Sequence, residues 1–301
     1  MSAPGIDAPP PPAPREIALD TPLGALAALR WGHEGAPRVL ALHGWLDNAA
    51  SFVLLAPHLL GAQGTALDLV AIDLPGHGRS AHLPPGSDYS FAGAMHAVLD
   101  AADALGWERF ALLGHSMGAG IASLVAAACP QRIDRLLAIE ALGALAETAD
   151  NTVPRMREAV AAARALPGKR LRTFASLEPA ITARINGHVA RVGRDAARLL
   201  VERGVRAVDG GWQWSSDPRL TLPTLVRMTE AQVRALIAGI ECDTRVLYAD
   251  PPQPYHPEPL RSAQAALLPR GELVVLPGSH HLHMEDPQAV AGAIGGFFLQ
   301  G

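Results

Sequence analysis

The sequence predicts a doubly wound α/β fold, a mostly parallel sheet with helices on both faces, interrupted by an inserted helical segment. Three observations predict it. Short apolar runs alternate with helix-like segments from residue 38 onward and again near the end of the chain. These runs are apolar almost throughout, which is typical of strands covered on both faces in a parallel sheet. Between the two regions, residues 146–241 carry arginine-rich helical patterns and no strand signal.

The elements follow along the chain in order. Two short strands are expected first, at residues 16–19 and 26–31, joined through a Pro-Leu-Gly turn. The strands expected in the parallel part are 38–42, 67–73, 110–114, 136–140, 245–249 and 272–276. The helices expected beside them are 50–60, 91–105, 119–129 and 287–299.

Residues 146–241 are expected to form a helical cap, inserted into a core made of residues 16–145 and 242–301. Helices are expected in it at 153–166, 181–202 and 223–240. Residues 147–241 hold fifteen Lys and Arg and ten Asp and Glu, a local charge of +5 in a chain of net charge −4. Solvated helix faces account for such an excess, and a bias toward anionic substrates is the alternative.

Composition narrows the class of protein. The net charge of −4 argues against a general nucleic-acid binder. Two cysteines, Cys129 and Cys242, suggest no disulfide framework or metal-ligand cluster and fit a reducing compartment. No apolar run approaches the roughly 20 residues that span a bilayer. Residues 1–15 are rich in proline, lack the parts of a secretory signal, and predict a disordered tail. We therefore expect a cytoplasmic protein without nucleic-acid or membrane partners.

The most informative motif is GHSMG, at residues 114–118, which lies between an apolar strand and a helix of small apolar residues. Strand, sharp turn and helix are the context that a nucleophile elbow requires. The turn forces Ser116 into a strained conformation, and the small flanking residues leave room for the bend. Its hydroxyl is then exposed at the carboxyl end of the strand. Ser116 is the candidate nucleophile, and a glycine-rich turn without chemistry is the alternative.

A serine nucleophile needs a base, and three histidines follow the last expected strand. His280 comes first in this loop, nearest to the strand end, and is the candidate general base. His281 and His283 are interpreted as loop or packing residues. Three neighbouring histidines also suggest a metal-binding site, but no carboxylate or cysteine lies at a spacing that is typical of zinc ligands. No metal is therefore expected.

An oxyanion hole needs a backbone donor besides the residue after the nucleophile. His43 and Gly44 follow the strand at 38–42, so the amides of this loop can line the same pocket. The backbone N–H groups of Trp45 and Met117 are the expected donors, and both side chains are expected to contact substrate. A His-Gly turn that only connects strand to helix is the alternative.

Four segments resemble the α/β-hydrolase superfamily in order and spacing: 43–45, 73–80, 114–118 and 278–287. More closely, HGWLDNAASF, LGWERFALLGHSMG and PGSHHLHMEDPQAV are similar to its serine hydrolase-like branch. The likeness covers about residues 16–145 and 242–300. It implies a Ser–His–acid hydrolase that needs no cofactor and whose cap selects the substrate. It also implies that residues 76–80 form a structural turn.

The position of the carboxylate that would complete the Ser–His–acid set departs from the commonest pattern of that superfamily. Many relatives carry an aspartate a few residues beyond the strand that follows the cap, where this chain has proline after Asp250. Glu140 closes the strand after the elbow helix, a position that supplies the acid in some branches. A carboxylate there would orient His280 and stabilise its imidazolium. Glu140 is the first candidate, Asp250 the alternative, and Asp47 is better interpreted as a loop hydrogen-bonder.

Together these residues predict a carboxylic ester hydrolase that works through an acyl-serine intermediate on a small-molecule acyl substrate. Thioester, lactone or amide hydrolysis would use the same groups and stays open. The serine at 116 argues against haloalkane dehalogenases and epoxide hydrolases, which use an aspartate nucleophile. A non-catalytic ligand-binding protein is the remaining alternative. Acyl-chain length and oligomeric state are left open.

Overall fold

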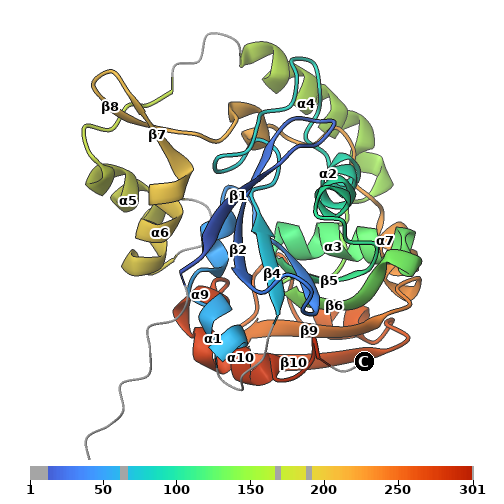
Figure 1. Cartoon of the computed structure of the whole chain (residues 1–301). Helices are drawn as coiled ribbons and strands as arrows, with labels where there is room; N and C mark the ends of the chain where they lie inside the picture. The colour runs from blue at the N-terminus through green and yellow to red at the C-terminus, as the bar shows by residue number, and fades with distance from the viewer. Residues whose placement is uncertain (1–12, 62–66, 167–170, 188–191, 300–301) are drawn as a thin grey trace, which may run out of the picture.

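An eight-stranded sheet crosses the molecule in the order β1-β2-β4-β3-β5-β6-β9-β10 (Figure 1). The structure is a computed structural model that describes residues 13–61, 67–166, 171–187 and 192–299. Strands β1, β2 and β4 pair antiparallel, and all other neighbours pair parallel. The strands are β1 (Arg15–Leu19), β2 (Leu26–Gly32), β3 (Arg38–Leu42), β4 (Asp68–Ile72), β5 (Phe110–His115), β6 (Ile133–Ile139), β9 (Asp243–Asp250) and β10 (Gly271–Pro277).

Helices cover both faces of this sheet, which confirms the predicted fold class. Alternate residues of β3 enter two separate cores, Leu40 and Leu42 on one face and Val39 and Ala41 on the other. This is why β3 is apolar at every position from 39 to 42. The first core is closed by α2 (Phe91–Ala104), α3 (Met117–Ala128), α7 (Glu230–Ala238) and α8 (Leu260–Ala265). The second is closed by α1 (Ala56–Gly61), α9 (Leu282–Glu285) and α10 (Pro287–Ile294).

Local chemistry explains where helices differ from the expected bounds. The segment expected as one helix at 50–60 divides into a 3-10 turn, Ala49–Phe52, and α1, which starts beside Pro57. Proline favours the first turn of a helix because it has no N–H to satisfy. Helix α10 ends at Ile294 because Gly295 adopts a φ of +50°.

The inserted segment holds helices and one hairpin. Its helices are α4 (Thr152–Ala165), α5 (Leu177–Ile185) and α6 (Arg194–Gly204), followed by strands β7 (Val205–Val208) and β8 (Gly211–Trp214). The expectation of helices alone was wrong for β7 and β8. An Asp-Gly-Gly turn with positive φ at Gly210 and Gly211 joins them, a strong hairpin signal that the helical pattern obscured. The helix expected at 181–202 is two helices, with residues 188–191 outside the described ranges.

The parts of this segment pack in different places. Figure 1 shows α5, α6 and the hairpin as a group beside the sheet, whereas α4 lies above α2. Helix α7 begins at Glu230, after a capping box between Thr229 and Gln232, and packs into the first core through Val233 and Ile237. The proposed cap boundaries remain a prediction.

The disordered tail predicted for residues 1–15 falls almost wholly outside the described residues, and β1 begins at Arg15. In the part of the chain that is described, no helix has both the length and the apolarity to cross a bilayer.

Candidate active site

Ser116 occupies a sharp turn between β5 and α3 with a φ of +52° and a ψ of −118°. Its backbone N–H donates to the carbonyl of Ile139 at 2.8 Å, which fixes the turn against β6. A Cβ at Gly118 would lie 2.1 Å from the carbonyl oxygen of Leu42. Only glycine therefore lets α3 approach the end of β3 this closely.

A continuous hydrogen-bonded chain joins Ser116, His280 and Glu140. His280 Nε2 lies 2.9 Å from Ser116 Oγ, and His280 Nδ1 lies 3.0 Å from Glu140 Oε2. A carboxylate only accepts hydrogen bonds, so Nδ1 carries the proton and Nε2 accepts from the hydroxyl. Glu140 is 4% exposed and also accepts the backbone N–H of Ala249 at 2.5 Å. The carboxylate is thus fixed on both oxygens.

Asp250, the alternative acid, lies elsewhere. It is the last residue of β9, its side chain is 67% exposed, and its nearest cation is Arg261 at 3.9 Å. Within the described residues it makes no hydrogen bond to His280. Asp250 is still part of strand β9, so its side chain is not directed past the sheet edge toward the loop of His280. Glu140, in contrast, directly follows the last residue of β6.

The histidine of the GHSMG motif supports the backbone of His280. His115 Nε2 donates to the carbonyl oxygen of His280 at 2.8 Å. Burial, together with the neighbouring histidines, holds the pKa of His115 well below its usual range, so the ring is neutral. The residue before the candidate nucleophile therefore positions the candidate base.

The loop after β3 presents the backbone N–H of Trp45. His43 Nδ1 donates to the Gly44 carbonyl at 2.7 Å, while His43 Nε2 accepts the N–H of Leu74 at 3.0 Å. In a trans peptide the N–H points opposite to the carbonyl, so holding the Gly44 oxygen also aims the Trp45 N–H. Burial lowers the pKa of His43 to about 4, which keeps it a neutral clamp. In the described chain, the N–H groups of Trp45 and Met117 have no acceptor within the protein.

Asp47 belongs to a buried network beside this chain. It accepts from His281 Nε2 at 3.0 Å and from Arg184 Nη2 at 2.7 Å. Burial alone would raise the pKa of Asp47, but His281 and Arg184 hold it well below its usual range. Asp47 is therefore an ionised loop hydrogen-bonder, and His281 is a buried partner for it. His283 is buried too and bonds to Ser51 at 2.7 Å.

Asp47, His115 and His281 offer ligand atoms within 4.8 Å of one another, a grouping that could hold a metal ion. Arg184 Nη2, however, lies 2.7 Å from Asp47 and 3.3 Å from His281. The guanidinium thus supplies positive charge where a cation would have to enter.

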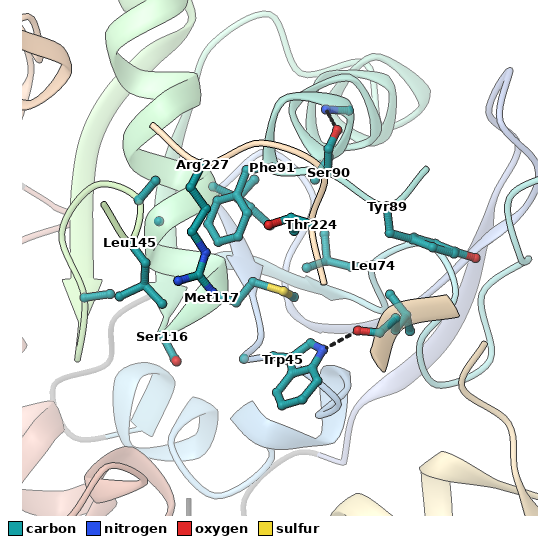
Figure 2. A pocket seen from close by; sticks show the side chains of 18 of the residues that line it. Trp45, Leu74, Tyr89, Ser90, Phe91, Ser116, Met117, Leu145, Thr224 and Arg227 are labelled. Atoms are coloured by element: carbon teal, nitrogen blue, oxygen red, sulfur yellow. Dashed lines mark hydrogen bonds between the residues drawn. The ribbon is translucent and has the colours of Figure 1, made fainter. Parts of the chain in front are cut away.

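A cavity of about 1500 Å³ opens above Ser116. Figure 2 shows the side chains of Trp45 and Met117 at its floor beside Ser116, and both residues line the cavity. The indole Nε1 of Trp45 donates to the carbonyl of Leu220 at 2.8 Å, which ties the loop after β3 to the inserted segment. The cavity is therefore bounded by the sheet edge below and the inserted segment above.

Three residues near the site escaped the sequence analysis. Tyr255 Oη lies 3.3 Å from His280 Nδ1, Arg184 pairs with Asp47, and Arg227 lines the cavity. The arginine excess of residues 147–241 was the one available signal, and it did not single out Arg184 or Arg227.

Comparisons with known proteins agree with this fold. A family model described as the alpha/beta hydrolase fold matches residues 37–176. A serine hydrolase-like protein of Dictyostelium discoideum is 30% identical over 287 residues, 91% of this chain and 79% of that protein. A serine hydrolase-like protein of Mus musculus is 30% identical over 306 residues, 95% of this chain and 96% of that one. The crystal structure of a hypothetical protein from Pseudomonas aeruginosa PAO1 is 42% identical, with a TM-score of 0.88 over 95% of this chain and 99% of that one.

Proposed function

The chain belongs to the α/β-hydrolase superfamily, in its serine hydrolase-like branch, and on this premise we propose that it hydrolyses carboxylic esters through an acyl-serine intermediate. One observation carries the proposal, the chain of contacts from Ser116 Oγ to His280 at 2.9 Å and from His280 to Glu140 at 3.0 Å. Nucleophile, base and orienting carboxylate are each within hydrogen-bond distance of the next.

In the first half-reaction, Ser116 Oγ attacks the ester carbonyl carbon while its proton passes to His280 Nε2. The carbonyl π bond becomes an oxyanion, which accepts from the N–H groups of Trp45 and Met117. When the carbonyl re-forms, the bond to the leaving oxygen breaks. His280 gives its proton to the departing alcohol, and Glu140 stabilises the imidazolium without taking the proton.

In the second half-reaction, water attacks the acyl-serine carbonyl and gives one proton to His280. The tetrahedral intermediate collapses, the bond to Ser116 Oγ breaks, and the histidine returns the proton to the serine. The products are an alcohol and a carboxylic acid, so one water is consumed per ester bond. The same steps apply to thioesters, lactones and amides, which differ only in the leaving group.

Free oxyanion donors favour an enzyme over a ligand receptor. The amides of Trp45 and Met117 have no acceptor in the described protein and border a cavity. Such donors typically contribute about 3–4 kcal/mol each to transition-state stabilisation. A receptor would have no need of these donors beside a hydrogen-bonded Ser–His–Glu chain.

The test uses p-nitrophenyl esters of graded acyl length and a serine-directed fluorophosphonate. We expect the parent protein to turn over at least part of the panel and to be labelled at Ser116, as located by peptide mass spectrometry. Ser116→Ala should lose both label and turnover, whereas Ser87→Ala, at another cavity-lining serine, should keep both. A folded parent that neither takes the label nor hydrolyses any acyl substrate would favour the receptor instead.

A further inference from the structure

Three guanidinium groups line the cavity above Ser116, and they differ in their partners. Arg155 pairs with Glu147 through two nitrogens. Arg219 pairs with Asp217, at 2.6 Å from Nη2. In the part of the chain that the structure describes, the third guanidinium, that of Arg227, has neither an ion-pair partner nor a hydrogen-bond acceptor.

Arg227 lies just before α7, near the end of the inserted segment. Figure 2 shows its side chain entering the cavity between Phe91 and Leu145, with the guanidinium directed toward Met117 and Ser116. A cation in this position faces the place where an acyl group would lie after attack by the serine.

The surroundings leave this charge poorly compensated. Desolvation by burial, and then repulsion from Arg155, lower the pKa of Arg227 below its ordinary value. Glu147 attracts Arg227 but is already engaged by Arg155. Because two of the three cavity arginines carry their own carboxylates, the third is equipped to receive one from a ligand.

Six carboxylates line the cavity: Asp47, Asp88, Asp100, Glu140, Glu158 and Glu230. In the described structure, none of them lies within ion-pair distance of Arg227. If one of them neutralised Arg227 in solution, removing the arginine would not change how the protein discriminates charged from neutral substrates. The experiment below measures that discrimination directly.

We propose that Arg227 binds an anionic group of the substrate, and that the substrate class is therefore acyl esters or thioesters bearing a carboxylate or phosphate. The inference rests on the proposed function of the site at Ser116 and narrows it. A guanidinium forms two parallel hydrogen bonds with either anion, which fixes geometry as well as adding affinity. Arg227 is thus a specificity-determining residue rather than part of the proton-transfer chain.

The first experiment compares matched ester pairs that differ only in charge. One series places the charge on the acyl part, as mono-p-nitrophenyl succinate, glutarate and adipate against their methyl-capped forms. The other places it on the leaving group, as 4-carboxyphenyl butyrate against 4-(methoxycarbonyl)phenyl butyrate. We expect the parent to prefer the charged member of one series by about 10- to 100-fold in kcat/KM, the range of a charge-assisted hydrogen bond.

Arg227→Gln should abolish this preference while changing kcat/KM for the neutral esters by less than about 3-fold. The matched control is Arg234→Gln, at an exposed arginine of α7 that does not line the cavity, and it should keep the preference. Turnover of neutral esters without preference in either series, or a preference that survives Arg227→Gln, would overturn the inference and leave the hydrolase proposal intact.

A second readout does not depend on turnover. Calorimetry with Ser116→Ala should show tighter binding of monomethyl adipate than of dimethyl adipate, and Arg227→Gln in that background should remove the difference. If no ester is hydrolysed but this difference is found, the proposed function fails and the anion site stands. Equal binding of the two ligands by both proteins overturns the anion site itself.

Discussion

At the scale of single residues, backbone strain coincides with the candidate active site. In the described part of the chain, three residues other than glycine adopt positive φ: Leu46 at +60°, Ser116 at +52° and Glu140 at +62°. Such conformations typically cost about 1–3 kcal/mol each and persist only where their surroundings enforce them. Here the sheet enforces two of them, because the N–H groups of Ser116 and Glu140 donate to the carbonyls of Ile139 and Leu247.

The two candidate acids give a prediction at this scale. Glu140→Gln keeps the size of the side chain but removes the charge that would stabilise the His280 imidazolium. We expect kcat for a p-nitrophenyl ester to fall about 10³- to 10⁴-fold, the loss seen when a triad carboxylate becomes an amide. Asp250→Asn alters an exposed side chain and should change kcat by less than about 3-fold.

Thermal unfolding of both variants controls for misfolding. Similar, mild losses of kcat in the two variants would show that neither Glu140 nor Asp250 is the carboxylate that assists His280.

At the scale of elements, the elbow helix depends on close backbone contact. Helix α3 is buried at nine of its twelve positions and meets the end of β3 through Gly118. Its small residues let it lie in the first core directly against the sheet. Packing density near that of a crystal leaves no space for even one added methyl group.

Gly118→Ala should therefore destabilise the protein and suppress hydrolysis, because its Cβ would meet the rigid backbone of Leu42. The matched control is Gly292→Ala in α10, where a Cβ meets nothing within 4 Å. That change should stabilise the protein by up to about 1 kcal/mol, since alanine favours helix more than glycine. Urea denaturation of both variants measures the contrast, and equal effects would contradict this view of the elbow.

Helices α5 and α6 are fastened to the core by buried polar contacts. Arg184 of α5 pairs with Asp47, and Arg203 of α6 pairs with Asp73 at 2.9 Å. Asn48 also donates to the carbonyl of Leu200 at 2.8 Å. Asp47 and Asn48 directly follow the loop that presents the Trp45 N–H, so the position of the inserted segment and the geometry of that loop are linked.

A double-mutant cycle tests this link. Arg184→Met should lower the free energy of unfolding by about 3–5 kcal/mol, because it leaves Asp47 charged and buried without that partner. Combined with Asp47→Asn, the loss should be smaller than the sum of the single losses by about 2 kcal/mol. The exposed pair Glu178 and Arg194, which joins the same two helices, serves as control and should couple by less than about 1 kcal/mol. Equal coupling in the two cycles would refute the link.

At the scale of the whole molecule, the central strands could be predicted from sequence because β3, β4 and β5 are buried along almost their whole length and carry a local apolar signature. The motifs around Ser116 and His280 were readable because each follows an apolar run. Their catalytic roles remain predictions. The contacts of Asp47 with Arg184, and of Trp45 with Leu220, join residues 137 and 175 positions apart. They depend on how an inserted segment folds back, and no local pattern encodes that.

Four histidines of the described chain are buried and neutral, and this predicts how the protein behaves in acid. Burial lowers the pKa of His43 to about 4 and of His77 to about 3, and holds those of His115 and His283 well below the usual value. In the unfolded chain these rings titrate near pH 6.5. Below that pH the unfolded state binds protons that the native state does not, so stability falls as pH falls.

Between pH 7 and pH 5, His43 and His77 should each reduce the free energy of unfolding by about 2 kcal/mol, and the other two histidines add to this loss. Since a typical domain is stable by only about 5–15 kcal/mol, we expect cooperative unfolding near or somewhat below pH 5. Urea denaturation followed by circular dichroism across this range measures the slope. His77→Gln should make it shallower by about 1.4 kcal/mol per pH unit between pH 6 and 4, because one proton fewer is taken up on unfolding. A free energy of unfolding that stays constant from pH 7 to pH 5 would mean that these rings take up protons in the native protein over the same pH range as in the unfolded chain. The neutral His43 clamp behind the Trp45 N–H would then have to be abandoned.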